Sequence, residues 1–267
     1  MRLIISCFLL SIVFVGCSKT KKDWQLKKEI KLDNVGPIGL VVLNDQLWLS
    51  DGDNNRLVQI NEDGKIEKEL VDFDRPMHIA VSENTILIPE YGRDTISTYT
   101  GGKKAFLSDI PKLDAPAGVF TLGKEMAIAN FYSNTVHFFN GTSWLQIGAK
   151  GTTEGKFNYP TDVHITKEFI FVADAYNHRV QVFDKSGQFV KVLGQNLGIN
   201  AATGIYVADK ELFITDFENS HVFVVSLENE LIQEITEAIK KPTDMLIYKE
   251  QLYVVNYKSG IVSVYER

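Results

Sequence analysis

The chain has 267 residues and a formal net charge of −6. This acidic balance argues against binding to nucleic acid, because proteins that bind it carry clustered Lys and Arg to neutralise phosphates. The length is sufficient for one domain stabilised by burial of its own core. The two cysteines, Cys7 and Cys17, lie near the N-terminus. The rest of the chain therefore has no thiol for a disulfide, a nucleophile or a thiolate metal site.

Residues 1–16 have the composition of a secretory signal peptide. A basic start at Arg2 is followed by an apolar run over residues 3–15, which is shorter than the about 20 residues of a membrane-spanning helix. The run ends in the sequence FVGC, which resembles a bacterial lipobox. The resemblance implies cleavage before Cys17, acylation of its sulfur and a polar tether over residues 17–22. We expect an exported lipoprotein held in a bacterial membrane, with the outer membrane favoured; a plain secreted protein is the alternative.

Residues 24–32 predict an extended strand ahead of a series of repeats. One face of this strand would carry four apolar side chains, Trp24, Leu26, Ile30 and Leu32. The strand leads into Pro37, the first of six equivalent positions.

From Pro37 onward the chain repeats about every forty residues, and a period of this length indicates a solenoid or a propeller. The repeats start at Pro37, Pro76, Pro116, Pro160, Ala202 and Pro242. A carboxylate or amide residue follows fourteen positions after each start, at Asp51, Glu90, Asn130, Asp174, Asp216 and Asn256.

Each repeat contains four strand-like segments. In the fourth repeat, apolar runs at residues 163–166, 170–174 and 179–183 are followed by a turn with Gly187 and a last run at residues 188–193. Four antiparallel strands of this kind form one propeller blade. No helical periodicity is sustained beyond the first fifteen residues, so we predict an all-β chain.

The sixth repeat ends after its third strand, at residues 260–265. We expect residues 24–32 to supply the missing fourth strand, which would join the two ends of the ring and leave no inner edge unpaired. The prediction is a six-bladed β-propeller over residues 23–267, with the last blade completed by the N-terminal strand. An open array of six repeats is the alternative.

The fourth repeat resembles an NHL repeat. The resemblance rests on YPTDV at residues 159–163, FVADAYNHRVQVFD at residues 171–184, and Gly187. The first repeat matches more loosely, and the other four keep the spacing but lose most signature residues. The resemblance implies a propeller over about residues 23–267. It implies little about activity, because NHL propellers include peptide- and RNA-binding modules, amidating lyases and bacterial envelope proteins.

Two rings of side chains are expected at one mouth of the propeller, because the start of the innermost strand and the loop after the second strand lie on the same face. One ring stands two residues after each repeat start and consists of Gly39, His78, Gly118, Asp162, Gly204 and Asp244. The other ring consists of Asp51, Glu90, Asn130, Asp174, Asp216 and Asn256. Their oxygens suit calcium or a polar ligand. A polar residue in every repeat equally suits the capping of a turn, so we assign no metal ligand and keep calcium as an alternative to no cofactor.

Histidines and aromatic residues add to this mouth. Only His78 occupies a ring position, whereas His164 lies two residues beyond Asp162 on the same side of its strand and could approach that carboxylate. Five of the six repeats place an aromatic residue one or two positions after the outer ring residue, and Tyr132 and Tyr176 are our candidate contacts for a peptide or a glycan. Packing of these rings between blades is the alternative.

Three functions stay open at this point. The favoured one is a membrane-tethered binding or scaffolding propeller that engages an envelope protein, peptide or glycan at its mouth. The second is a cation-dependent lactonase or lyase that uses the acidic mouth, and the third is a structural subunit of an envelope complex. No glycine-rich phosphate loop and no G-x-S-x-G motif is present, and we predict no nucleic-acid partner.

Overall fold

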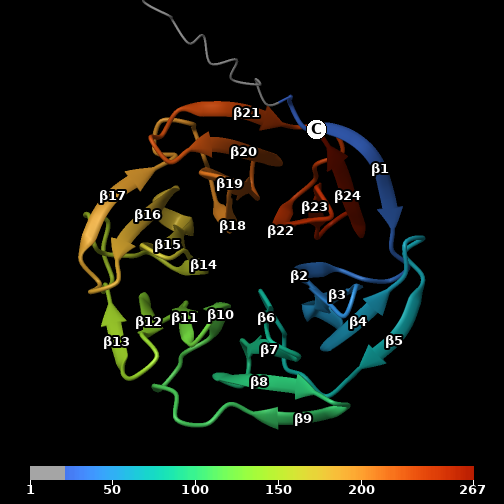
Figure 1. Cartoon of the computed structure of the whole chain (residues 1–267), viewed down its shortest axis with the longest axis horizontal. Coiled ribbons are helices and arrows are strands. Elements are labelled where there is room, and N and C mark those ends of the chain that lie inside the picture. Colours follow the sequence, from blue (N-terminus) through green and yellow to red (C-terminus); the bar gives the residue numbers. More distant parts are fainter. Residues whose placement is uncertain (1–21) are drawn as a thin grey trace, which may run out of the picture.

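The computed structural model describes residues 22–267, and these form a ring of six four-stranded antiparallel sheets around a central axis (Figure 1). This confirms the predicted all-β, six-bladed propeller. The predicted signal peptide and the acylation site Cys17 lie outside the described residues, as does the tether except for Lys22. Within the described part, no helix is long and apolar enough to cross a bilayer.

Five blades follow one another along the chain, each running from the innermost to the outermost strand. The first blade has β2 (Pro37–Leu43), β3 (Gln46–Asp51), β4 (Arg56–Ile60) and β5 (Ile66–Leu70), and the second has β6 (Ala80–Ser82), β7 (Thr85–Glu90), β8 (Thr95–Thr100) and β9 (Lys103–Phe106). The third has β10 (Pro116–Leu122), β11 (Glu125–Asn130), β12 (Thr135–Phe139) and β13 (Trp144–Ile147). The fourth has β14 (Pro160–Ile165), β15 (Phe169–Asp174), β16 (Arg179–Asp184) and β17 (Phe189–Leu193), and the fifth has β18 (Ala202–Ala208), β19 (Glu211–Asp216), β20 (His221–Ser226) and β21 (Leu231–Ile235). Two short 3-10 segments, η1 (Gly52–Asn54) and η2 (Ala175–Asn177), connect the second and third strands of the first and fourth blades.

The sixth blade joins the two ends of the described chain. Its three inner strands are β22 (Pro242–Tyr248), β23 (Gln251–Asn256) and β24 (Ile261–Glu266), and its outer strand is β1 (Gln25–Lys31). β1 pairs antiparallel with β24, with Ile30 opposite Val262 (Figure 1). The predicted closure of the ring by the N-terminal strand is therefore confirmed, and the open array is excluded.

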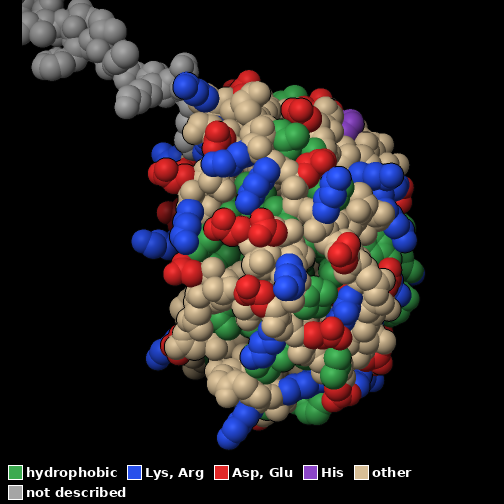
Figure 2. All heavy atoms as spheres, turned by 90° about the vertical axis from the view of Figure 1, so that its right-hand side faces the viewer, with side chains coloured by type: hydrophobic (Ala, Val, Ile, Leu, Met, Phe, Trp, Pro, Cys, Tyr) green, Lys and Arg blue, Asp and Glu red, His purple; other side chains and the backbone are tan. Residues whose placement is uncertain are grey.

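The hydrophobic core lies between neighbouring blades rather than in one central mass. Phe171 and Val182 of the fourth blade pack in one cluster with Ile205 and Ile214 of the fifth. Because each sheet buries both faces against its neighbours, its inner strands are almost continuously apolar. The outer wall is different: on the side of β1 and β5, Figure 2 shows basic and acidic side chains interspersed, with no extended area of one sign.

Candidate functional site

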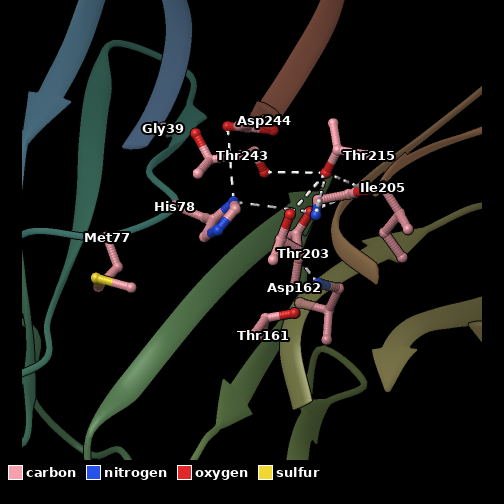
Figure 3. Close-up of polar contacts among 12 residues, drawn as sticks. Gly39, Met77, His78, Thr161, Asp162, Thr203, Ile205, Thr215, Thr243 and Asp244 are labelled. Carbon is pink, nitrogen blue, oxygen red and sulfur yellow. Dashed lines mark hydrogen bonds and ion pairs between the residues drawn. The ribbon is translucent and has the colours of Figure 1, made fainter. Parts of the chain in front are cut away.

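Three polar side chains converge on the axis of the ring. His78 precedes β6, Asp162 lies in β14 and Asp244 lies in β22, so they come from alternate blades (Figure 3). The His78 Nδ1 atom is 4.0 Å from Asp162 Oδ2 and 3.9 Å from Asp244 Oδ2. These separations are too long for hydrogen bonds, so the three groups face one another across a small gap.

Glycines at the equivalent positions of the other three blades make this convergence sterically feasible. A Cβ on Gly39 would lie 2.8 Å from the Met77 carbonyl oxygen, and one on Gly204 would lie 2.2 Å from that of Thr243. Gly118 is equally confined, at 2.8 Å from the carbonyl oxygen of Thr161. The ring is so narrow at this level that only every second blade has room for a side chain.

Backbone amides hold both carboxylates in the same orientation. Asp162 accepts hydrogen bonds from its neighbour Val163 (2.8 Å) and from Ile205 of the next blade (2.9 Å). Asp244 repeats the pattern with Met245 (2.8 Å) and Leu40 (3.0 Å). In each case the oxygen bonded to the next blade is also the one that faces His78. The two carboxylates are therefore fixed by the fold before any ligand is present.

Burial dominates the electrostatics of this cluster. It lowers the pKa of His78 to about 4, raises the pKa of Asp162 to about 7, and raises that of Asp244, with the nearby charge of Asp162 as a second cause. All three pKa shifts favour the uncharged forms, because a buried charge without a close partner loses its hydration. By themselves, the three side chains therefore resist carrying two negative charges near neutral pH.

The six residues of the predicted outer ring lie in the wall of the propeller and not at its axis. Their side chains are buried, and each accepts a hydrogen bond from a backbone amide of the segment that leads into its own blade. The donors are Gly36, Asp74, Asp114, Asn158, Asn200 and Lys240, which bond to Asp51, Glu90, Asn130, Asp174, Asp216 and Asn256 respectively. This corrects the expectation that the outer ring projects into the mouth, because its oxygens are used to cap loops within the wall.

A cavity of about 550 Å³ opens on the face where the innermost strands begin; we call it the funnel. All six blades line it, and its lining includes Ile38, Arg75, Phe131, Tyr176, Phe217 and Tyr257, with His78 at its narrow end. Beyond that end lies an inner cavity of about 130 Å³, lined in part by His78, Asp162 and Asp244. The axial cluster thus lies at the neck between the two cavities.

The aromatic residues of the loops show both predicted behaviours. Phe131 stacks on Tyr159 with ring centroids 4.7 Å apart, and Tyr159 contacts Tyr176 edge to face at 5.2 Å. Nevertheless 53% of Tyr132 and 58% of Tyr176 remains exposed. The rings therefore pack against one another and still present a surface at the rim, with Tyr176 also lining the funnel.

Some funnel residues were missed by sequence reasoning. Thr161, Thr203 and Thr243 line the funnel, and their hydroxyls bond the carbonyl oxygens at the start of the next blade, at 3.0, 3.1 and 3.2 Å. Their signal was present, because threonine follows the repeat start in three consecutive repeats. Arg75 gave a weaker signal: it directly precedes a repeat start, and only the sixth repeat also has a basic residue there, Lys241.

The inner cavity contains a second buried imidazole. The ring of His164 lies 4.0 Å from that of Phe120 and 5.3 Å from that of Tyr206, and its Nδ1 has no hydrogen-bond partner within residues 22–267. Burial lowers the pKa of His164 to about 3. The expected approach to Asp162 is not among its hydrogen bonds or ion pairs in the described chain; the imidazole instead lies between two aromatic rings.

His164 should make the protein sensitive to acid. An unfolded histidine takes up a proton near pH 6.5 and this folded one only near pH 3, so acidification between these values favours unfolding by about 1.4 kcal/mol per pH unit. Replacement of His164 by Phe should remove this contribution. Urea unfolding in chelator-containing buffer measures this. Between pH 7 and pH 5, the free energy of unfolding of the wild type should fall by about 2 kcal/mol more than that of the variant.

A matched control for this measurement is Tyr206→Phe, which changes the same cavity without altering a group that titrates in this pH range. Its loss of stability between pH 7 and pH 5 should equal that of the wild type. If His164→Phe also behaved like the wild type, the imidazole would have to be hydrated in the folded protein.

Comparisons with known proteins agree with this architecture. Residues 157–183 match the NHL repeat. The E3 ubiquitin-protein ligase TRIM32 of Mus musculus and that of Homo sapiens are each 37% identical over 57 residues, which is 21% of this chain and only 9% of the relative's length. The chain therefore shares only a short segment with these curated relatives.

Solved structures extend the similarity to most of the chain. A selenomethionine-substituted virginiamycin B lyase from Staphylococcus aureus superposes with a TM-score of 0.67 over 92% of this chain and 100% of its own, at 16% identity. A streptogramin B lyase gives 0.65 over 91% and 87%, also at 16% identity. A chain of a nidogen/laminin complex gives 0.63 over 74% and 79%, at 17% identity. At these identities the likeness shows the propeller fold alone.

Proposed function

We propose that this chain is a binding propeller that holds a polypeptide segment of a partner protein in the funnel. The observation that carries the proposal is the exposed aromatic rim around a cavity lined by all six blades. The funnel volume of about 550 Å³ falls within the about 300–1,000 Å³ of typical ligand sites. Tyrosine is enriched among the residues that dominate binding energy, because its ring offers a large apolar surface and its hydroxyl a hydrogen bond.

The chemistry of the lining favours a polypeptide. Ile38, Met77 and Phe217 can cover an apolar side chain, while Thr161 and Asn200 offer polar groups to a peptide backbone. The Arg75 guanidinium lies 5.2 Å from the ring centre of Tyr91 and has no ion-pair partner within the described chain. A cation held in this way at the funnel wall suits an acidic side chain or a terminal carboxylate of the bound segment.

The membrane tether is part of the same proposal. Acylation of Cys17 would hold the propeller at a bacterial envelope, where its partner would be another envelope protein. In support, β1 lies on the outer rim of the sixth blade, far from the axis, so a tether ahead of it would leave the funnel accessible (Figure 1). The intact mass of the mature protein tests this, because acylation of Cys17 adds the mass of its fatty chains.

Crosslinking followed by mutation tests the binding role. A photo-crosslinking residue in place of Tyr176 should trap a polypeptide in intact cells, and mass spectrometry would identify the trapped segment. With a synthetic peptide of that segment, Tyr176→Ala should weaken binding by about 30-fold, which corresponds to about 2 kcal/mol. Isothermal titration calorimetry gives this ratio.

Tyr248, at the end of β22 that lies away from the funnel, provides the matched control, because it is a tyrosine that does not line the funnel. Tyr248→Ala should bind the peptide like the wild type, and a crosslinker at position 248 should not trap the segment. A trapped glycan, or equal affinities of the two alanine variants, would refute polypeptide binding in the funnel.

A further inference from the structure

The axial cluster has an unsatisfied polar atom aimed at its centre. The His78 side chain is only 5% exposed, and its Nδ1 has no hydrogen-bond partner within residues 22–267. A buried polar atom without a partner costs about 1–3 kcal/mol, so proteins rarely retain one unless something binds there. Carboxylate oxygens of Asp162 and Asp244 face this Nδ1 atom at 4.0 and 3.9 Å, and the gap lies between the three side chains (Figure 3).

The size of this gap matches a metal ion. One ligand atom from each of His78, Asp162 and Asp244 lies within 4.8 Å of the other two. Because two of the three separations are 3.9 and 4.0 Å, a point equidistant from the three atoms is at most about 2.5 Å from each, and an inward movement of a few tenths of an ångström gives the about 2.0–2.2 Å of zinc ligation. The cluster therefore needs no rearrangement of the backbone to enclose an ion.

The surroundings of the cluster provide the support that a metal site requires. The carboxylate oxygens that face the gap each accept a backbone amide, from Ile205 and Leu40, which fixes their direction. Such outer contacts orient metal ligands and tune affinity in known sites. The equivalent positions of the other three blades are glycines, so they offer no side chain that could fill the gap: Gly39, Gly118 and Gly204.

The charge balance points the same way. Within the part of the chain that the structure describes, neither Asp162 nor Asp244 forms an ion pair with a lysine or an arginine. Two buried carboxylates this close repel each other, and a divalent cation would neutralise both at once. One proton could relieve only half of that charge.

We propose that His78, Asp162 and Asp244 bind one divalent transition-metal ion, Zn²⁺ or Mn²⁺, with its remaining coordination positions open along the axis. An imidazole nitrogen beside two carboxylates suits these ions, whereas calcium and magnesium prefer oxygen ligands alone. Zinc sites that bind a water or a substrate have three protein ligands and leave the fourth coordination position open. The site faces the funnel through His78 but does not depend on peptide binding there.

The test uses the purified full-length chain after removal of metals by a chelator. Titration with ZnCl₂ or MnCl₂ should show one equivalent bound and a rise in melting temperature, with CaCl₂ and MgCl₂ at least tenfold weaker. His78→Ala and Asp244→Asn should each weaken binding by at least about 100-fold, since loss of a residue that only orients a ligand already costs about 10–100-fold. Failure of the wild type to bind a stoichiometric ion would overturn the proposal and leave a bridging water as the partner of His78.

A matched control distinguishes metal binding at the axial cluster from metal binding at the protein surface. His221 pairs with Glu234 at 2.8 Å on the outside of the fifth blade, where an imidazole and a carboxylate could hold zinc weakly. His221→Ala should bind the ion like the wild type; loss of binding in this variant instead of in His78→Ala would place the metal at the surface.

A spectroscopic measurement on the wild type keeps the proposal falsifiable if the axial variants fail to fold. Pulsed electron paramagnetic resonance of the Mn²⁺ complex should show coupling to the nitrogen of one imidazole. Its absence, with Mn²⁺ bound, would overturn the assignment of His78 as a ligand.

Discussion

Deletion of residues 23–31 should abolish cooperative folding of the monomer. The deletion removes β1, so β24 keeps β23 but loses its outer partner, and the core loses the buried side chains of Trp24 and Ile30. Truncation of one such side chain to alanine costs about 2–5 kcal/mol, and a whole domain is stable by about 5–15 kcal/mol. Loss of both side chains and of the outer strand of the sixth blade should therefore remove most of the free energy of unfolding.

The position of Trp24 makes this effect larger than that of an ordinary edge strand. Its backbone N–H and carbonyl bond the side chain of Gln233 at 2.8 and 2.9 Å, and its ring contacts Phe213 of the fifth blade at 6.1 Å. Trp24 thus joins the fifth and sixth blades, while β1 directly after it completes the sixth sheet. The single change Trp24→Ala should already cost about 3–5 kcal/mol.

Circular dichroism and urea unfolding measure both variants. A synthetic peptide of residues 23–31 added in trans should restore cooperative unfolding to the deleted protein. The control is Lys27→Ala, on the exposed face of the same strand, where only the ion pair with Glu266 is lost and about 0–1 kcal/mol is expected. A deleted protein that unfolds at the wild-type midpoint would show that β1 does not hold the ring closed.

Asp174→Ala should destabilise the protein by about 3–5 kcal/mol. The buried carboxylate accepts hydrogen bonds from the Asn158 amide (2.8 Å), the Arg179 guanidinium (2.9 Å) and the side chains of Asn177 and Gln181 (both 2.9 Å at their shortest). Alanine would leave all these donors without their acceptor and Arg179 without its counter-charge. Burial raises the pKa of Asp174 in spite of these donors, which shows how strongly the site is desolvated.

The conservative change Asp174→Asn should cost less, because an amide oxygen can still cap the Asn158 amide. The sixth blade shows how: Asn256 accepts from Lys240 at 2.7 Å and donates to the Ser263 hydroxyl at 2.9 Å. Asp184→Ala, at the half-buried end of β16, is the control: its carboxylate accepts hydrogen bonds from Ser186 and Gln188 in a turn open to water, and its loss should cost only about 1 kcal/mol. Denaturant unfolding compares the three; equal costs for Asp174→Ala and Asp184→Ala would refute a capping role for the outer ring.

The repeat could be predicted from the sequence because it depends on residues that are close to one another along the chain. Pro37, Pro116, Pro160, Ala202 and Pro242 begin β2, β10, β14, β18 and β22 as the spacing predicts. Only Pro76 departs, since it forms an isolated bridge with Glu90 and β6 starts at Ala80. Strand length, turn residues and period depend on neighbours in the sequence, and the truncated last repeat pointed directly to its partner strand.

The sequence alone thus determined the fold, the number of blades and the closing strand. Only the tertiary structure decided which ring faces the axis. The period shows which residues are equivalent in the six blades, but it does not show whether their side chains point toward the axis or into the wall. A register shift at the start of the innermost strands, as between Pro160 and Asp162, turns the inner ring toward the axis, while the outer ring turns back to cap loops. The convergence of His78, Asp162 and Asp244 depends on that turn and on the narrowness of the ring, and neither quantity is encoded within a single repeat.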